Sequence, residues 1–85
     1  MPVEARFFSS LRAAAGVASI DIAADTVRTA DRVLRERYAN NSEFLRLLQI
    51  SNVILNGDNV LFLKGPRTAL KDGDELSYFP PLGGG

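Results

Sequence analysis

The residue types that most often carry enzyme chemistry are missing from this chain. Its 85 residues include no cysteine and no histidine. Without cysteine there is no disulfide, thiolate metal ligand or thiol nucleophile, and without histidine the commonest general base and zinc ligand is missing. The last six residues are Pro80, Pro81, Leu82, Gly83, Gly84 and Gly85. We therefore expect the carboxyl group of Gly85 to be the reactive group, and the chain to have no catalytic site of its own.

The three glycines have no side chains to bury, so residues 83–85 cannot contribute to a core. They suit a tail that another protein threads through a narrow channel. The Gly85 carboxylate is ionised at neutral pH and is a poor electrophile, so it would first need activation, for example as an acyl adenylate made with ATP. Sulfide or a persulfide that displaces AMP would leave a thiocarboxylate, whereas a lysine amine would leave an isopeptide. The alternative is a frayed terminus or a cloning remnant.

The segment before the glycines predicts a strand followed by a conformationally restricted, extended segment. Residues 75–79 alternate polar and apolar side chains, as a half-buried strand does. Pro80 and Pro81 end this strand, because neither has an N–H and each favours extended geometry in the residue before it. We expect one domain over residues 1–81 and a flexible tail over residues 82–85.

The composition is that of an ordinary globular domain. With 46% hydrophobic and 24% charged residues, neither disorder nor a fibrous structure is indicated, and 85 residues allow one small core. Ten basic residues balance ten acidic ones, so no net charge attracts a nucleic acid or an anionic membrane. No secretion signal or long apolar segment is present. We expect a compact protein that works in the cytoplasm.

The start of the chain predicts a β-hairpin. Residues 3–8 and 17–22 carry the alternation of strands with one buried face. Residues 9–16 predict a loop or a short helical turn, with Leu11 as its buried anchor and Gly16 as its end. The residues expected to face the core are Val3, Ala5, Phe7, Ile20 and Ile22.

The longest helix is predicted to begin after Thr26, a suitable N-cap, because apolar residues recur at helical spacing as far as Tyr38. Its other side is charged and includes an Asp31–Arg35 pair at i,i+4. We interpret that side as a solvated face, with a basic partner site as the alternative. Asn40-Asn41 ends the helix.

A shorter helix and a second hairpin follow. Ser42 is expected to cap the helix, with Phe44, Leu45, Leu47 and Leu48 as its apolar contacts. Residues 52–56 predict a third strand, and the Asn56-Gly57 turn leads into a fourth near residues 60–63. Residues 64–69 predict a loop, after which Leu70 returns to the core. The turn Asp72-Gly73-Asp74 precedes the last strand.

Strand alternation also predicts an apolar patch outside the core. If Leu76 and Tyr78 face the helix, Phe79 lies on the opposite, open face of the sheet, together with Phe8 and Ile54. Such a cluster is not needed for the core and indicates a docking surface, although single exposed apolar residues are common on any protein. We favour docking because the patch adjoins the base of the tail.

The ending FPPLGGG, preceded by DGDE and by the Asn56-Gly57 turn, resembles the molybdopterin-synthase small-subunit family (MoaD type). These ubiquitin-like sulfur carriers are related to the thiamin sulfur carrier ThiS and to archaeal small modifier proteins. The similarity runs from Phe7-Phe8 to Gly85. It implies an α+β, ubiquitin-like β-grasp fold, in which a mixed sheet of four to five strands carries one main helix on one face and ends in a flexible Gly-Gly tail.

The resemblance also implies roles for individual residues. Gly85 would be adenylated and then thiocarboxylated, and Gly84 would be its thin neighbour. The residues expected to line the partner's channel are Pro80, Pro81, Leu82 and Gly83. Phe8 and Phe79 match aromatic docking positions. Arg12 matches a basic position after the first strand, with a surface salt bridge as the alternative.

The function implied is that of a sulfur carrier for molybdopterin or its tungsten-binding equivalent. It would bind no cofactor itself, use ATP through a ubiquitin-activating-type adenylating enzyme, and join the large subunit of molybdopterin synthase. Gly83, Asp31 and the length of the 64–69 loop depart from the family pattern and weaken the case for molybdopterin as the acceptor. A second hypothesis is a protein modifier joined through Gly85 to lysines of other proteins. A third is a binding module with an inert tail.

Overall fold

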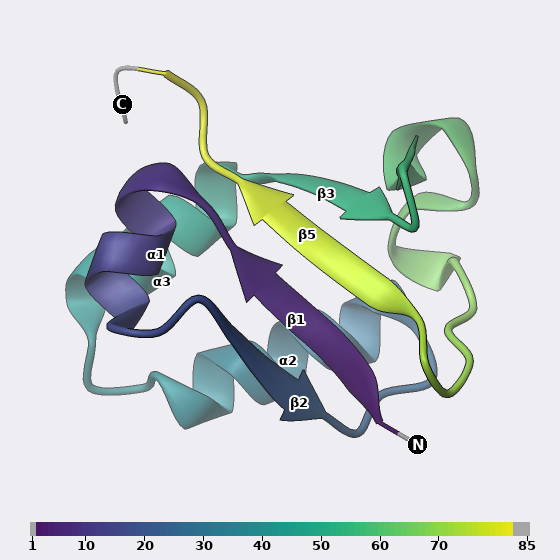
Figure 1. Cartoon of the computed structure of the whole chain (residues 1–85), viewed down its shortest axis with the longest axis horizontal. Helices are drawn as coiled ribbons and strands as arrows, with labels where there is room; N and C mark the ends of the chain where they lie inside the picture. Colours follow the sequence, from purple (N-terminus) through teal and green to yellow (C-terminus); the bar gives the residue numbers. More distant parts are fainter. Residues whose placement is uncertain (1, 83–85) are drawn as a thin grey trace.

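In a computed structural model, which describes residues 2–82, these residues form one five-stranded sheet with three α-helices packed against its core face (Figure 1). The strands lie in the order β2-β1-β5-β3-β4. Their bounds are β1 Val3–Phe7, β2 Ser19–Ile22, β3 Asn52–Leu55, β4 Asp58–Asn59 and β5 Glu75–Phe79.

The first and last long strands meet at the centre of the sheet. β1 runs parallel to β5, with Ala5 opposite Leu76 and Phe7 opposite Tyr78. The other neighbouring strands are antiparallel: β1 with β2, β3 with β5 and β3 with β4. A mixed sheet of this order, crossed by a helix, is the predicted β-grasp. The parallel pair fixes the base of the tail beside the end of β1.

Three helices cover the core face: α1 Ser9–Ala15, α2 Val27–Arg37 and α3 Ser42–Ile50. The segment between the two first strands is therefore a seven-residue helix, and Leu11 is its buried residue as predicted. α2 is the longest helix, and the Thr29 N–H donates to Thr26 Oγ1 at 3.1 Å, which confirms the predicted cap. α2 is thus the predicted main helix, α3 is the predicted shorter helix, and α1 replaces the predicted loop or short helical turn.

The core forms where these helices meet the sheet. Phe7 packs edge-on against Phe44 and Tyr38, with ring centroids 5.3 and 6.1 Å apart, an arrangement that aromatic quadrupoles favour. Tyr38 and Phe44 stack on each other at 3.9 Å. The predicted alternation holds on β1 and β5, since Val3, Ala5, Phe7, Leu76 and Tyr78 are all buried.

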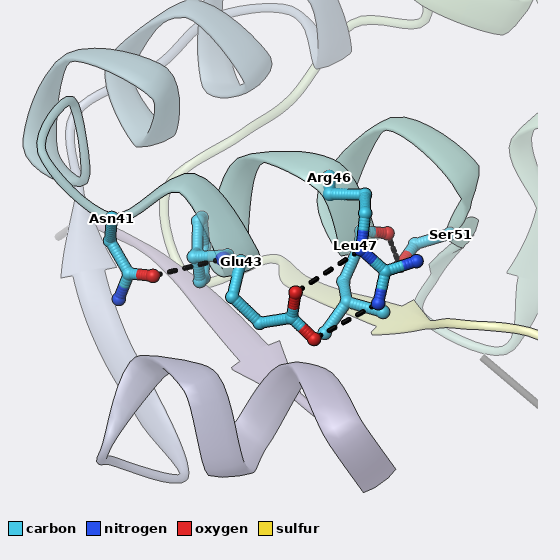
Figure 2. Close-up of polar contacts among 6 residues, drawn as sticks. Asn41, Glu43, Arg46, Leu47 and Ser51 are labelled. Carbon is cyan, nitrogen blue, oxygen red and sulfur yellow. Dashed lines mark hydrogen bonds and ion pairs between the residues drawn. The ribbon is translucent and has the colours of Figure 1, made fainter. Parts of the chain in front are cut away.

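α3 is fixed by polar contacts at both ends (Figure 2). The Phe44 N–H donates to Asn41 Oδ1 at 2.9 Å, so Asn41 is the N-cap and the prediction of Ser42 was wrong by one residue. Asn41 also donates to the Ala14 carbonyl oxygen at the end of α1. This second bond joins two helices and cannot be recognised from local sequence. At the other end, the Ser51 hydroxyl donates to the Leu47 carbonyl oxygen at 2.7 Å.

The second hairpin turns where predicted, but its return strand is shorter and earlier. Asn56 and Gly57 have φ angles of 48° and 94°, the left-handed pair that a two-residue hairpin turn requires. β4 then covers only Asp58–Asn59, and Val60–Phe62 is a 3₁₀ turn, η1. The Leu61 N–H donates to Asn59 Oδ1 at 2.9 Å, which starts η1 and ends the strand. The apolar run at 60–63 was therefore wrongly predicted as a strand.

The turn before β5 is tied to the second hairpin through Asp74, a buried carboxylate. The Lys71 N–H donates to Asp74 Oδ2 at 2.7 Å, and Asn56 Nδ2 donates to Asp74 Oδ1 at 3.0 Å. The Lys71 backbone bond, followed by the Asn56 bond and the Lys71 charge, holds the pKa of Asp74 below its ordinary value. Asn56 Oδ1 also accepts from the Glu75 N–H. These bonds fix the start of the strand that ends at the tail.

We predict that Asp74 makes the stability of the domain depend on pH. Because its pKa is lower in the folded than in the unfolded state, its contribution is present above the unfolded value and is lost as the pH falls through the folded value. Asp74→Asn should lower the free energy of unfolding at pH 7 by about 1 to 2 kcal/mol, because hydrogen bonds to charged groups are stronger than those to neutral ones. It should also flatten the acid limb of the stability profile. Urea unfolding between pH 7 and 2 measures both, and an unchanged acid limb would contradict the assignment.

Among residues 2–82, no helix is both long and apolar enough to cross a membrane.

Candidate functional site

β5 leads directly into the tail. Phe79, its last residue, is 38% exposed and lies on the open face of the sheet. Pro80 is buried, Pro81 is exposed and Leu82 is 99% exposed. The chain therefore leaves the domain after Pro80, and of the predicted channel-lining residues Pro81 and Leu82 are accessible. Gly83, Gly84 and Gly85, which make up the rest of the predicted tail and carry the predicted reactive carboxyl group, lie outside the described residues.

Phe8 and Phe79 are brought together as a stacked pair, with ring centroids 4.2 Å apart and planes inclined by 14°. The parallel pairing of β1 with β5 causes this contact, because it places Phe7 opposite Tyr78 and so the next residues side by side. Phe8 is half-buried and occupies the N-cap position of α1, but its side chain makes no capping hydrogen bond. A phenylalanine is a poor N-cap, so its ring serves the sheet face and not the helix.

The residue after Phe8 has a strained backbone conformation, which allows the Phe8 ring to stay beside Phe79. Ser9 has a φ of 53°, a left-handed conformation that costs a residue with a side chain of order 1 kcal/mol. Ser9 turns the chain from β1 into α1 within one residue. Phe8 can therefore remain on the open face while α1 folds onto the core face.

Ile54 lies on the same face, one row away. It pairs with Ser77, whereas Phe79 pairs with Asn52, so Ile54 and Phe79 are diagonal neighbours across β3 and β5. We call Phe8, Ile54 and Phe79, together with Arg6, the tail-base surface. Its three apolar members were predicted from strand alternation. Whether this surface docks a partner stays a prediction.

Arg6, which is exposed on β1, was not predicted as a site residue. Its Cζ lies 5.8 Å from the centroid of the Phe8 ring, and its Nη1 lies 3.3 Å from Glu75 Oε2. The first contact is a cation–π arrangement, and the second is an exposed ion pair of small energetic value. The signal in the sequence was the shared parity of Arg6 and Phe8 on one strand. One cation therefore lies beside the stacked rings.

Arg12 lies apart from the contacts that define the tail-base surface. It is exposed on α1 and, with Gly16 and Val17, lines a shallow hollow near the end of that helix. Neither the predicted binding role nor its alternative, a surface salt bridge, is supported by a side-chain partner within residues 2–82. The partner-binding role of Arg12 stays a prediction.

The tail-base surface combines three apolar side chains with one cation. The described residues include no group of three or more metal-ligating side chains close enough to hold an ion. Comparison with known families identifies what kind of protein this is: the model of the ThiS family matches residues 5–85. The chain belongs to the ThiS family.

Two relatives of this family member are archaeal modifier proteins. Small archaeal modifier protein 3 of Haloferax volcanii is 39% identical, and the match covers all of both chains. The solution structure of small archaeal modifier protein 1 from Methanosarcina acetivorans is 27% identical with a TM-score of 0.80, and the match covers 98% of this chain and 95% of that one.

A third relative is a subunit of a complex. The structure of subunits 1 and 2 of the molybdopterin-converting factor from Helicobacter pylori contains a chain 28% identical to this one, with a TM-score of 0.71 and complete coverage of both chains. The chain is thus a ubiquitin-like protein of the sulfur-carrier and small-modifier type. These similarities leave the choice between the two uses open.

Proposed function

We propose that this ThiS-family protein is a sulfur carrier whose Gly85 is adenylated and then thiocarboxylated, and that it donates this sulfur in molybdopterin biosynthesis as the small subunit of the synthase. The observation that carries the proposal is the position of the tail. An exposed aromatic stack stands at the end of β5, three residues before fully exposed Leu82. A partner that covers the stack is placed to receive the glycines that follow.

The chemistry needs two displacements, both performed by partners. A Gly85 carboxylate oxygen bonds to the α-phosphorus of ATP, and pyrophosphate leaves. The sulfur of sulfide then bonds to the carbonyl carbon as the bond to AMP breaks, which gives the thiocarboxylate and AMP. The chain itself binds no cofactor in this scheme; ATP belongs to a ubiquitin-activating-type adenylating enzyme. Because ATP supplies the activation, we place the carrier in the cytoplasm.

Two partners are proposed for the same end of the molecule. The adenylating enzyme and the synthase large subunit would both bind the tail-base surface, in succession, since each must reach Gly85. The Helicobacter pylori complex supports the second partner, because a relative of this chain is one of its two subunits. The balance of ten basic and ten acidic residues gives no reason to add a nucleic acid or a membrane.

Conjugation to proteins is the second candidate function, and a specific observation favours it. The relative with 39% identity is named as a modifier protein. In that role, a lysine amine of a target protein would displace the activating group and form an isopeptide with Gly85. The same tail and the same surface would serve both reactions.

One transfer experiment separates the two functions. The purified chain, loaded as its Gly85 thiocarboxylate, is mixed with the host's synthase large subunit and the pterin precursor. We expect the thiocarboxylate to return to carboxylate as sulfur enters the pterin, with no turnover when the large subunit is omitted. Retention of the sulfur, together with Gly85–lysine isopeptides in an extract supplied with ATP and activating enzyme, would replace the carrier role by the modifier role.

A further inference from the structure

A second apolar feature lies on the core face of the sheet, opposite the tail-base surface, and its lining includes Tyr78 of β5. It is a pocket of about 350 Å³, at the lower end of the size range of ligand pockets. Its apolar lining comes from α2, α3, β3 and the two 3₁₀ turns, η1 and η2 Gly65–Arg67. The apolar residues that line it include Val27, Leu48, Val53, Val60, Leu61 and Pro66.

Three consecutive apolar side chains at the rim of this pocket are exposed to solvent. Leu61 is 73% exposed and Phe62 is 87% exposed, and Leu63 follows them. Three consecutive exposed apolar residues are unfavourable on a surface unless they bind something. Because Leu61 belongs to both the exposed run and the pocket, the two form one continuous apolar surface.

The floor of the pocket holds an unused hydrogen-bonding group. Tyr78 is 1% exposed and lines the pocket, and its hydroxyl has no hydrogen-bond partner within residues 2–82. Burial, with a smaller effect of the Asp31 charge, raises the pKa of this phenol. A buried polar group without a partner is costly. An occupant that supplies an acceptor would remove that cost.

Among residues 2–82, three positive charges without an ion-pair partner belong to the pocket lining or adjoin it in sequence. Arg28 lines the pocket, and Lys64 and Arg67 flank Gly65 and Pro66. The acidic residue of the lining, Asp31, is already bound by Arg35 at 2.7 Å. The pocket therefore presents an excess of positive charge although the chain is neutral.

We propose that the pocket and the Leu61–Phe62 rim bind an acidic peptide segment of a partner protein, with one leucine or phenylalanine of that segment inserted into the pocket and its carboxylates against Arg28, Lys64 and Arg67. Charge complementarity selects this occupant. A second copy of the chain fits poorly, because a two-fold contact would bring the same cations together. The surface is separate from the tail-base surface, so a partner bound here can hold the carrier while Gly85 is engaged elsewhere.

The test does not depend on sulfur chemistry. The full-length ¹⁵N-labelled chain is titrated with a blocked synthetic peptide that has a leucine and a phenylalanine flanked by glutamates. We expect saturable shifts of Val27, Val53 and Leu61 and no shift of Asp21, which lies on β2 at the other edge of the sheet. A second peptide with glutamine at every glutamate position should bind at least about fivefold more weakly, as expected when attractive charge contacts are lost.

Two variants and a matched control locate the site. Leu61→Ser removes exposed apolar surface and Arg28→Glu reverses one rim charge, and each should weaken binding by about fivefold or more. Arg37→Glu makes the same charge change on the same helix, at an exposed position outside the pocket, and should leave binding unchanged. Absence of saturable shifts, equal binding of both peptides, or concentration-dependent shifts at the pocket without peptide would overturn the proposal; the last result would indicate self-association.

Discussion

Gly84→Val should lower formation of the Gly85 thiocarboxylate by at least about 100-fold, because even a small displacement of a reacting atom costs about that factor. A branched side chain beside Gly85 would widen a tail that the activating enzyme is proposed to take into a narrow channel. The fold should not change, since the buried core of the domain is formed by residues that precede Pro81. The rate of thiocarboxylate formation by the host's adenylating enzyme measures the effect.

The control for this variant is Ala23→Val, a branched substitution at an exposed position in the loop after β2. It should load sulfur at the wild-type rate. An added bulky residue after Gly85 should behave like Gly84→Val. If both altered tails form the thiocarboxylate at the wild-type rate, the tail does not need to pass through a narrow channel. The three glycines would then have no explanation.

Phe79→Arg should weaken binding to the adenylating enzyme by about 30-fold, the effect of losing about 2 kcal/mol at an interface hot spot. The substitution breaks the 4.2 Å stack with Phe8 and places a second cation near Arg6. Because Phe79 is already 38% exposed, the domain should remain folded. Affinity measured by calorimetry or by surface-immobilised enzyme gives the change.

Ala39→Arg provides a control, since it adds the same cation at an exposed position after α2 that lies outside the lining of the pocket. We expect this variant to bind the adenylating enzyme as the wild type does. Equal losses in the two variants would mean that the effect of Phe79→Arg is not specific to the tail-base surface.

Alternation and capping made much of the fold predictable. The two faces of β1 and β5 follow from period-two patterns, and Thr26 was identified as a cap because the apolar period begins directly after it. The errors came where tertiary contacts compete with local patterns. Asn41 caps α3 while it also bonds to Ala14, and an Asn59 side-chain bond converts an apolar run into a 3₁₀ turn.

The sequence predicts which face of the sheet each site residue lies on, because side chains alternate along a strand. It does not predict which residues of neighbouring strands lie opposite each other. Parity placed Phe8, Ile54 and Phe79 on one face, but the ring contact between Phe8 and Phe79 exists only because β1 and β5 are parallel in one particular register. The burial of Pro80 and the pocket lined by Tyr78 depend on packing between elements that are distant in sequence. No local pattern contains that information.

The central claim is that Gly85 carries sulfur, and the most direct measurement is the intact mass of the chain after incubation with its host's adenylating enzyme, ATP and sulfide. Since oxidation of the single methionine gives nearly the same mass change as oxygen replaced by sulfur, the sample is also treated with a thiol-alkylating reagent. The chain has no cysteine, so alkylation reports the thiocarboxylate alone. We predict one ATP-dependent alkylated group, located at Gly85 by fragmentation. An active adenylating enzyme that leaves the chain without any alkylated group would contradict the sulfur-carrier account.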